Sequence, residues 1–201
     1  SWSDVPKEDG RRLWLGWLSN WQYANNIPTH PWRSAMSIPR SLALRTTTDG
    51  LRMVQSPVKE LRTLREEKTE LINLTIENGT LALGSKGISG KRLEIIADVK
   101  INNASEIGFR LRTGNEEASI VGYDVKLQEL FVDRTSSGNI TFHDSFTGKH
   151  TGPLTSANGR IRLHIYLDDS SIEIFGNRGE TVLSERIFPS PENIGVEFYS
   201  K

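Results

Sequence analysis

Residues 20–23 bring together side chains that are suited to holding a sugar. The segment reads Asn-Trp-Gln-Tyr, so an indole and a phenol lie beside two carboxamides. Aromatic faces pack against the C–H groups of a sugar ring, while amides hydrogen-bond to its hydroxyl groups. The alternative for any single aromatic residue here is an ordinary place in a β-sheet core. Taken together, these residue types favour one wall of a binding site.

The tryptophans are concentrated near the N-terminus. Four of the five lie between Arg12 and Arg40, and the fifth is Trp2. Residues 13–18 carry large apolar side chains at both odd and even positions, so both faces of a strand here would be apolar. Gly16 leaves room for a neighbouring backbone or a ligand to approach. This pattern predicts a strand that is buried on both faces and that positions the 20–23 segment at its end.

Three carboxylates lie close together in the segment 168–173, which reads Asp-Asp-Ser-Ser-Ile-Glu. A glycosidase needs two carboxyl groups about 5–9 Å apart across a sugar. Here the composition is that of a hairpin turn, and Glu173 should point outward between two isoleucines, so we predict a solvated turn. His143 and His164 each lie near an aspartate but lack a nearby nucleophile, and we expect them at the surface or at a strand edge.

The composition argues against several classes of partner. Lys+Arg and Asp+Glu total 25 each, so no net charge favours nucleic acid or a membrane surface, and any substrate should be neutral. The chain has no Cys and four scattered His, so we expect no disulfide, no metal site and no cofactor. An apolar run of about 20 residues, as a membrane span needs, is absent.

Short apolar segments separated by turn residues predict an all-β fold. Near the N-terminus we expect strands at 41–44 and 51–54, joined by a turn at Asp49-Gly50. A short helix is predicted over 57–67, because Ser56 is a suitable N-cap and a proline follows it at the first helical position.

Beyond Lys68 the pattern predicts an antiparallel β-sandwich. Alternation is clearest in 160–167, where Ile161, Leu163, Ile165 and Leu167 should share a core-facing side. The predicted strands are 71–76, 81–83, 93–101, 106–112, 119–124, 129–133, 160–167, 172–175, 181–187 and 195–199.

The string WLGWLSNWQYANNIPTHPWRSAMSIPR, residues 14–40, resembles the signature of the last propeller blade in glycoside hydrolase family 32. The family includes levanases, exo-inulinases and invertases, and bacterial levanase-type sequences are the most similar. The likeness continues through QSPVKEL at 55–61 and DDSSIEIFGNRGE at 168–180. Small departures occur at Ser41, where the family usually has Glu, and at Asp169, where a basic residue is common.

The resemblance implies a C-terminal antiparallel β-sandwich preceded by the final strands of a five-bladed β-propeller and a short linker helix. It divides the chain into a remnant of the last blade at 1–55, a linker helix at 56–68 and the sandwich at 69–201.

The resemblance also ranks the candidate site residues. Trp21 matches the family's Trp that lines the pocket for the terminal fructosyl unit. Asn20, Tyr23 and Trp32 are weaker candidates for substrate binding, since their side chains could instead brace the loop.

The family's catalytic residues have no counterparts in this sequence. Its members use an Asp nucleophile in a Trp-x-Asn-Asp-Pro-Asn-Gly motif, a Glu acid/base next to a Cys, and an Asp in an Arg-Asp-Pro motif; neither Asp-Pro-Asn-Gly nor Arg-Asp-Pro occurs here. The resemblance therefore implies a parent enzyme that hydrolyses terminal β-D-fructofuranosyl bonds with retention, and a 201-residue chain that is inactive alone. The alternative is a non-catalytic module for carbohydrate binding or oligomerisation.

The expected partners follow from the same resemblance. They are a fructan or sucrose substrate, the propeller domain that would precede this segment, and a second copy of the chain pairing through exposed blade strands. Neither nucleic acid nor a membrane is expected, and secretion from a bacterium is favoured over a cytoplasmic location.

Overall fold

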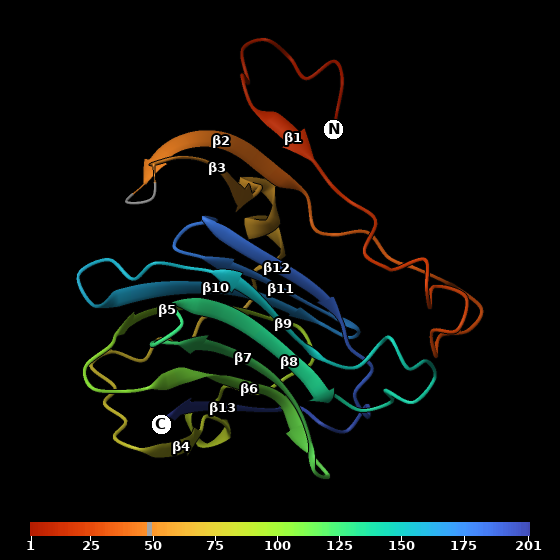
Figure 1. Ribbon diagram of the computed structural model, residues 1–201. Coiled ribbons are helices and arrows are strands. Elements are labelled where there is room, and N and C mark those ends of the chain that lie inside the picture. The colour runs from red at the N-terminus through yellow and green to blue at the C-terminus, as the bar shows by residue number, and fades with distance from the viewer. Residues whose placement is uncertain (48–49) are drawn as a thin grey trace.

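The computed structural model describes residues 1–47 and 50–201, and almost all of its regular structure is β-strand (Figure 1). The strands form antiparallel sheets of three, four and six strands. The all-β prediction is therefore confirmed. Asp49, part of the predicted turn between the first long strands, lies outside the described residues.

Two of the sheets make the sandwich. The four-stranded sheet has the order β12-β11-β10-β5, and the six-stranded sheet has the order β4-β13-β6-β7-β8-β9. A single turn of 3-10 helix, η2, follows β4 at Gly84–Lys86. The strands are β4 (Gly79–Ala82), β5 (Leu93–Lys100), β6 (Glu106–Gly114), β7 (Glu117–Asp124), β8 (Glu129–Ser136), β9 (Lys149–Pro153), β10 (Arg160–Asp168), β11 (Ser171–Gly176), β12 (Thr181–Arg186) and β13 (Gly195–Ser200).

The main core lies between these two sheets. Ile161, Leu163, Ile165 and Leu167 of β10 are all buried, as the alternation predicts. They pack in one cluster with apolar side chains of the six-stranded sheet, among them Leu111, Val121, Leu130 and Val196. Burying each such side chain contributes about 1.5–3 kcal/mol before conformational entropy is counted, so this core is a major source of the stability of the fold.

One predicted strand of the sandwich is absent, and one observed strand was not predicted. Residues 71–76 form no strand, and Ile72 is exposed because no neighbouring strand pairs with this segment. Conversely, β9 has the sequence Lys-His-Thr-Gly-Pro, which carries no strand pattern. It is a strand because its backbone pairs with β8, with Glu129 opposite Pro153, at the edge of the six-stranded sheet.

The N-terminal sheet has the order β1-β2-β3, with β1 at Arg12–Trp14, β2 at Arg40–Thr47 and β3 at Gly50–Pro57. The predicted strand over 13–18, buried on both faces, is wrong in extent and in burial. β1 ends at Trp14, and Trp17 makes only an isolated bridge to Met36. Both faces of a strand are buried only where sheets or helices cover each of them, and β1 instead lies at an edge of its sheet.

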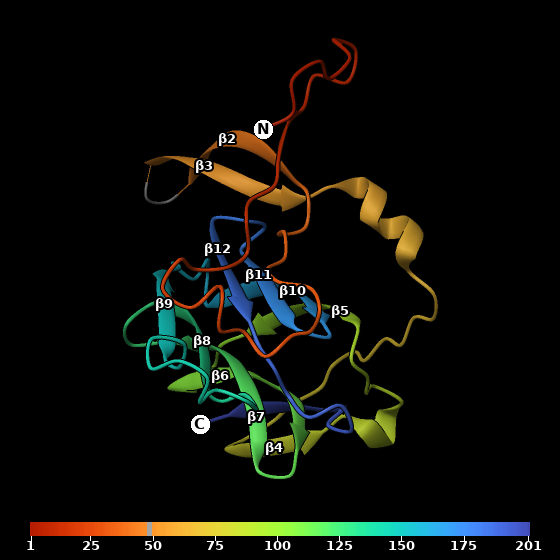
Figure 2. The ribbon, with the colours of Figure 1, turned by 90° about the vertical axis from the view of Figure 1, so that its right-hand side faces the viewer.

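The predicted linker helix is shorter than expected. It is a 3-10 helix, η1, at Lys59–Leu64, and Ser56 and Pro57 belong to β3 instead of capping it. None of the residues of η1 is buried, so no apolar face holds a longer α-helix against the sandwich. Figure 2 shows η1 leading away from the end of β3 while the β2–β3 hairpin lies above the four-stranded sheet.

Glu173 of β11 joins the hairpin to the sandwich, and the prediction that Glu173 is solvated is wrong. Its carboxylate accepts hydrogen bonds from the Ile38 amide at 2.7 Å and from the Arg40 guanidinium, and Glu173 is 2% exposed. Glu173 does point away from the main core, but the N-terminal segment covers that face. The preceding turn is solvated as predicted, with Asp168 and Asp169 paired to the exposed Arg92.

A glycine permits the second close contact between these parts. The Gln55 amide of β3 donates to the Gly179 carbonyl at 3.0 Å. Gly179 has φ +88°, and a Cβ there would lie 1.8 Å from the Gln55 carbonyl oxygen. Any side chain at this turn would push β3 away from the sandwich.

Candidate functional site

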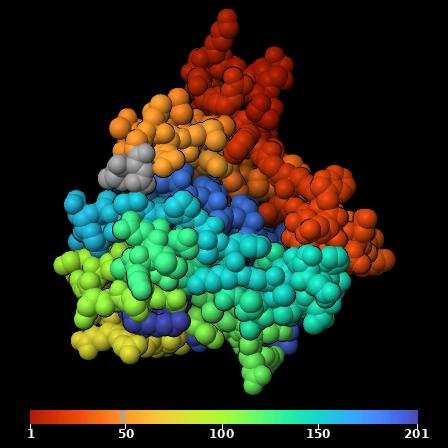
Figure 3. Space-filling model, viewed as in Figure 1, coloured from red at the N-terminus to blue at the C-terminus, as the bar shows by residue number. Residues whose placement is uncertain are grey.

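The candidate site is carried by a long loop, residues 16–37, that leaves β1 and returns to β2. Backbone hydrogen bonds close its base, from Leu18 to the Ala35 carbonyl at 2.8 Å and from Ser37 to the Gly16 carbonyl at 2.8 Å. The far part of the loop lies beside the segment that joins β8 and β9 (Figure 1). In the space-filling view the loop covers one side of the sandwich, while the first residues (red) project away from it (Figure 3).

Asn20 organises the turn at the start of this loop. Its carbonyl accepts the amides of Tyr23 and Ala24 at 3.1 and 2.8 Å, and its side-chain Oδ1 accepts the Gln22 amide at 2.9 Å. The carboxamide of Asn20 thus caps the turn, a use for which Asn is well suited. The structure gives Asn20 a bracing role, which leaves the amino group of its carboxamide for other contacts.

Trp21 projects from this turn into solvent and is 88% exposed. Its ring lies 4.8 Å from the ring of Trp17, measured between centroids, at an interplanar angle of 51°. The Trp17 indole N–H donates to the Ser34 hydroxyl, which ties the Trp17 ring to the part of the loop that returns to β2. The two indoles form an open aromatic surface that can stack on a sugar ring.

Tyr23 faces the opposite way, into the sandwich. It is 6% exposed and meets the Phe146 ring edge-on at 5.4 Å and the Phe142 ring edge-on at 6.2 Å. Ile27 from the same loop is buried in the same small cluster. The ring of Tyr23 is therefore used to hold the loop on the sandwich and is turned away from the surface that Trp21 presents.

Trp32 marks the other end of the loop. Its ring is 48% exposed, and the Arg186 guanidinium lies 5.5 Å from the ring centroid. The Thr29 hydroxyl donates to the Trp32 carbonyl at 2.6 Å and fixes the local backbone. Burial lowers the pKa of Arg186, and the nearby aromatic faces partly replace the water that the guanidinium has lost. Trp32 thus combines a packing role with a partly open ring.

The loop can bind a sugar but cannot supply the acid and nucleophile of hydrolysis. Residues 16–37 contain no Asp and no Glu, and the ionisable side chains apart from Tyr23 are His30 and Arg33. Two carboxyl groups facing each other across the sugar are needed for retaining hydrolysis. The chemistry that this loop offers is stacking, hydrogen bonding and exclusion of water.

A second group of ionisable side chains lies on the outer face of the four-stranded sheet. Glu94 accepts hydrogen bonds from His164 at 2.7 Å, from Tyr166 at 3.0 Å and from Arg65 at 2.6 Å. Burial acts to raise the pKa of Glu94, but these hydrogen bonds outweigh it and lower the pKa to about 2. His164 is partly buried, and burial lowers its pKa despite the carboxylate; the expectation of a surface histidine near Asp168 is corrected.

This group anchors the segment after η1 to the sheet and offers no catalytic pair. Its acceptor is a carboxylate held by three donors that lower its pKa, which makes Glu94 a weak base. The Arg65 side chain reaches it from the linker and so connects the N-terminal part of the chain to the sandwich.

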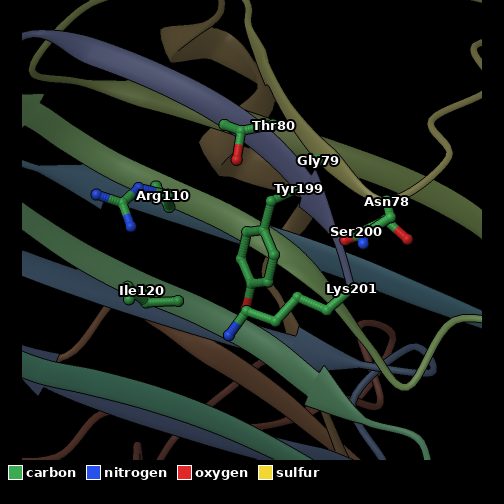
Figure 4. A pocket seen from close by; sticks show the side chains of 8 residues that line it. All are labelled: Asn78, Gly79, Thr80, Arg110, Ile120, Tyr199, Ser200 and Lys201. Atoms are coloured by element: carbon green, nitrogen blue, oxygen red, sulfur yellow. The ribbon is translucent and has the colours of Figure 1, made fainter.

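A shallow hollow of about 250 Å³ lies on the outer face of the six-stranded sheet (Figure 4). Figure 4 shows Tyr199 at its centre with Arg110, Thr80 and Lys201 around it. The Tyr199 ring is buried and lies over Gly122, where a Cβ would meet its hydroxyl at 2.5 Å. Arg110 is paired with Glu197 at 3.0 Å, so the hollow presents few free polar groups.

Over residues 1–47 and 50–201, no group of three His, Asp or Glu is arranged to hold a metal ion. Within the same ranges, no helix is long and apolar enough to cross a membrane.

Sequence reasoning missed the residues of the sandwich that receive the loop. Phe142 and Phe146 lie between β8 and β9, Arg134 is at the end of β8, and Arg186 ends β12. The one available signal was the pair of phenylalanines four residues apart in a polar segment. Nothing local connects them with Tyr23, more than a hundred positions earlier.

In a comparison with known protein families, two models of one family match consecutive parts of the chain. The model described as "Glycosyl hydrolases family 32 N-terminal domain" matches residues 2–57, and "Glycosyl hydrolases family 32 C terminal" matches residues 60–201. A levanase of Bacillus subtilis is 50% identical over 203 aligned positions, which cover 100% of this chain and 30% of the relative. An extracellular exo-inulinase of Aspergillus niger is 38% identical, covering 92% of this chain and 35% of the relative.

Solved structures agree with this result. The crystal structure of an exo-inulinase from Aspergillus awamori superimposes with a TM-score of 0.83 at 35% identity, over 94% of this chain and 37% of that chain. A fructan 1-exohydrolase from Cichorium intybus has the same fold, with a TM-score of 0.78 at 17% identity. The chain spans 30% of the length of the Bacillus subtilis levanase and 35% of the length of the Aspergillus niger exo-inulinase.

Proposed function

The chain belongs to family 32 of the glycosyl hydrolases, and from this we propose that it is the C-terminal part of a longer enzyme that hydrolyses terminal β-D-fructofuranosyl bonds. The observation that carries the proposal is the 50% identity to a levanase over the whole chain. Levan, inulin and sucrose are the substrates to be compared, since the relatives' names include a levanase and exo-inulinases.

In this proposal the chain supplies one wall of the pocket and the accessory domain. Residues 1–55 form the end of the last propeller blade, 56–68 the linker and 69–201 the sandwich. Trp21 stacks on the terminal fructosyl ring, which its exposure and its indole neighbour support. The nucleophile and the acid/base come from residues outside this chain, because the loop 16–37 has no carboxylate and the Asp-Pro-Asn-Gly motif of the family's nucleophile does not occur in the sequence.

Turnover and affinity measured together test the proposal. The isolated chain should release no fructose from levan, inulin or sucrose, whereas the longer protein should release it, since the covalent step requires a nucleophile and the leaving group an acid. Fructose release that copurifies with the intact 201-residue chain would contradict this division of roles.

The second candidate function is a carbohydrate-binding module without catalysis, and the open surface of Trp17 and Trp21 favours it. It predicts that levan binds the isolated chain and that the longer protein has no turnover. A longer protein that hydrolyses fructan would exclude it. We also propose secretion, because relatives of this chain are named as extracellular.

A further inference from the structure

We propose that the sandwich positions the substrate-contacting loop through an aromatic seat, and that Phe146 is its central positioning residue. The seat consists of Phe142, Phe146 and Arg134 of the sandwich, which receive Tyr23 and Ile27 of the loop. This inference rests on the proposed function, since it assigns a purpose to the orientation of Trp21. It gives the sandwich a direct part in shaping the pocket.

The first step is that Trp21 and Tyr23 belong to one compact turn. The backbone amides of Tyr23, Ala24 and Asn26 all donate hydrogen bonds to carbonyls within residues 20–26, at 2.8–3.1 Å. The Asn20 side chain caps the same turn. A turn with this many internal hydrogen bonds moves as a unit, so the placement of Tyr23 sets the direction in which Trp21 points.

The second step is that the sandwich determines the placement of Tyr23. Phe146 is 0% exposed and contacts Tyr23 edge-on, with ring centroids 5.4 Å apart. The Arg134 guanidinium lies 4.2 Å from the Phe146 centroid and 6.0 Å from the Tyr23 centroid. Arg134 is itself held by Glu185 at 3.1 Å and by the Arg186 carbonyl at 3.2 Å. Tyr23 thus contacts Phe146, Phe146 contacts Arg134, and Arg134 is held in turn by β12.

The third step is that the loop is held at two points, with Trp21 outside both. At the second point Arg186 faces the Trp32 ring at 5.5 Å and the Phe188 ring at 5.1 Å. The Arg186 Nε–H donates to the Ser170 carbonyl at 2.9 Å. Holding a loop at both ends restricts its rotation on the sandwich, so the exposed indole keeps one direction.

Hydrogen exchange on the 201-residue chain provides the first measurement. Replacing Phe146 by Ala should speed exchange of the Tyr23, Ala24 and Asn26 amides by about tenfold, while amides of β10 change little, because the opening is local. The control is Phe109→Ala in the main core, which should lower the melting temperature without a selective effect on the turn. Unchanged exchange in the turn of Phe146→Ala would overturn the inference.

A double-mutant cycle in the longer protein provides the functional measurement. Phe146→Ala should lower kcat/KM by about tenfold, mainly by raising KM, since a misplaced stacking residue weakens ground-state and transition-state binding alike. In a Trp21→Ala background the same change should have less than about a twofold further effect, because the residue that it positions is gone. Phe146→Leu, which keeps most of the buried volume, should restore most of the activity.

The outcomes separate this inference from the proposed function. If the longer protein hydrolyses fructan and the effects of Phe146→Ala and Trp21→Ala on kcat/KM multiply in full, the positioning role is wrong while the function stands. If Trp21→Ala leaves kcat/KM unchanged, both the contact at Trp21 and the positioning role are wrong. If the unaltered longer protein releases no fructose, the proposed function itself is wrong.

Discussion

Trp21 and Tyr23 are two positions apart in the sequence and lie in opposite environments. Trp21 is exposed to solvent, and Tyr23 is buried against Phe146. Their residue types alone would allow either to stack on a sugar. Burial separates the two roles, because the buried ring of Tyr23 presents no open face to a ligand.

The prediction at this scale concerns Trp21→Ala. In the longer protein it should lower kcat/KM by about ten- to a hundredfold, as expected for losing an aromatic contact of about 1–3 kcal/mol. In the isolated chain it should change unfolding free energy by less than about 0.5 kcal/mol, because the side chain is so exposed. Denaturant unfolding beside kinetics on sucrose checks both values.

The control for that experiment should be a residue of the main core. Leu163→Ala should cost about 2–5 kcal/mol through the cavity that it leaves. Trp14 is a poor control, because it lies in the edge strand β1 and is only partly buried. If Trp21→Ala destabilises the chain as much as Leu163→Ala, Trp21 is a core residue and the sugar has been placed against the wrong side chain.

Strand β11 is covered on both of its faces. Ile172 and Ile174 face the main core, and Glu173 between them faces the N-terminal segment. The carboxylate receives the Arg40 guanidinium, which also donates to the Ser184 hydroxyl at 2.5 Å. A buried ion pair of this kind adds little net stability over apolar residues, but removing one partner leaves the other charge buried and unpaired.

The prediction at the element scale is that Glu173→Ala lowers the free energy of unfolding by about 3–5 kcal/mol. The matched control is Glu70→Ala, which removes an exposed pair with Lys68 and should cost less than about 1 kcal/mol. Urea unfolding of the isolated chain measures both. Equal effects of the two substitutions would mean that the Arg40–Glu173 contact does not hold the hairpin on the sandwich.

Across the whole molecule, the N-terminal sheet is only partly covered by other elements. Leu44 and Met53 are cross-strand neighbours on one face of the β2–β3 hairpin, and both are exposed. Leu51, two positions from Met53 on the same strand, is also exposed. The chain carries no net charge, so electrostatic repulsion does little to keep copies apart. Apolar faces of this kind tend to bury themselves against a partner.

The prediction at this scale is that the isolated chain self-associates through the hairpin. The molar mass from light scattering should rise with concentration, and the double substitution Leu44→Lys with Met53→Glu should abolish the rise while leaving the melting curve nearly unchanged. Leu127→Lys, at an exposed position of the sandwich, is the control and should have no effect on association. A monomeric chain at every concentration would contradict the prediction.

Features that repeat locally could be predicted from the amino-acid pattern. The alternation in 160–167 predicted the buried face of β10, and the spacing of turn residues predicted most of the sandwich strands. The motif at 14–40 indicated the family and drew attention to Trp21. These features are local because side-chain direction in a strand is set by its own period of two, whatever lies opposite.

Which faces of the strands and turns are covered depends on how distant segments pack. Glu173, Tyr23 and His164 all lie on faces that a single strand or turn would leave open, and each is covered by a segment far away in the chain. β9 likewise forms because β8 offers it a free edge. Burial on a second face depends on packing between distant segments, from 70 residues apart for His164 and Glu94 to 135 for Glu173 and Ile38, and local periodicity contains no information about that contact.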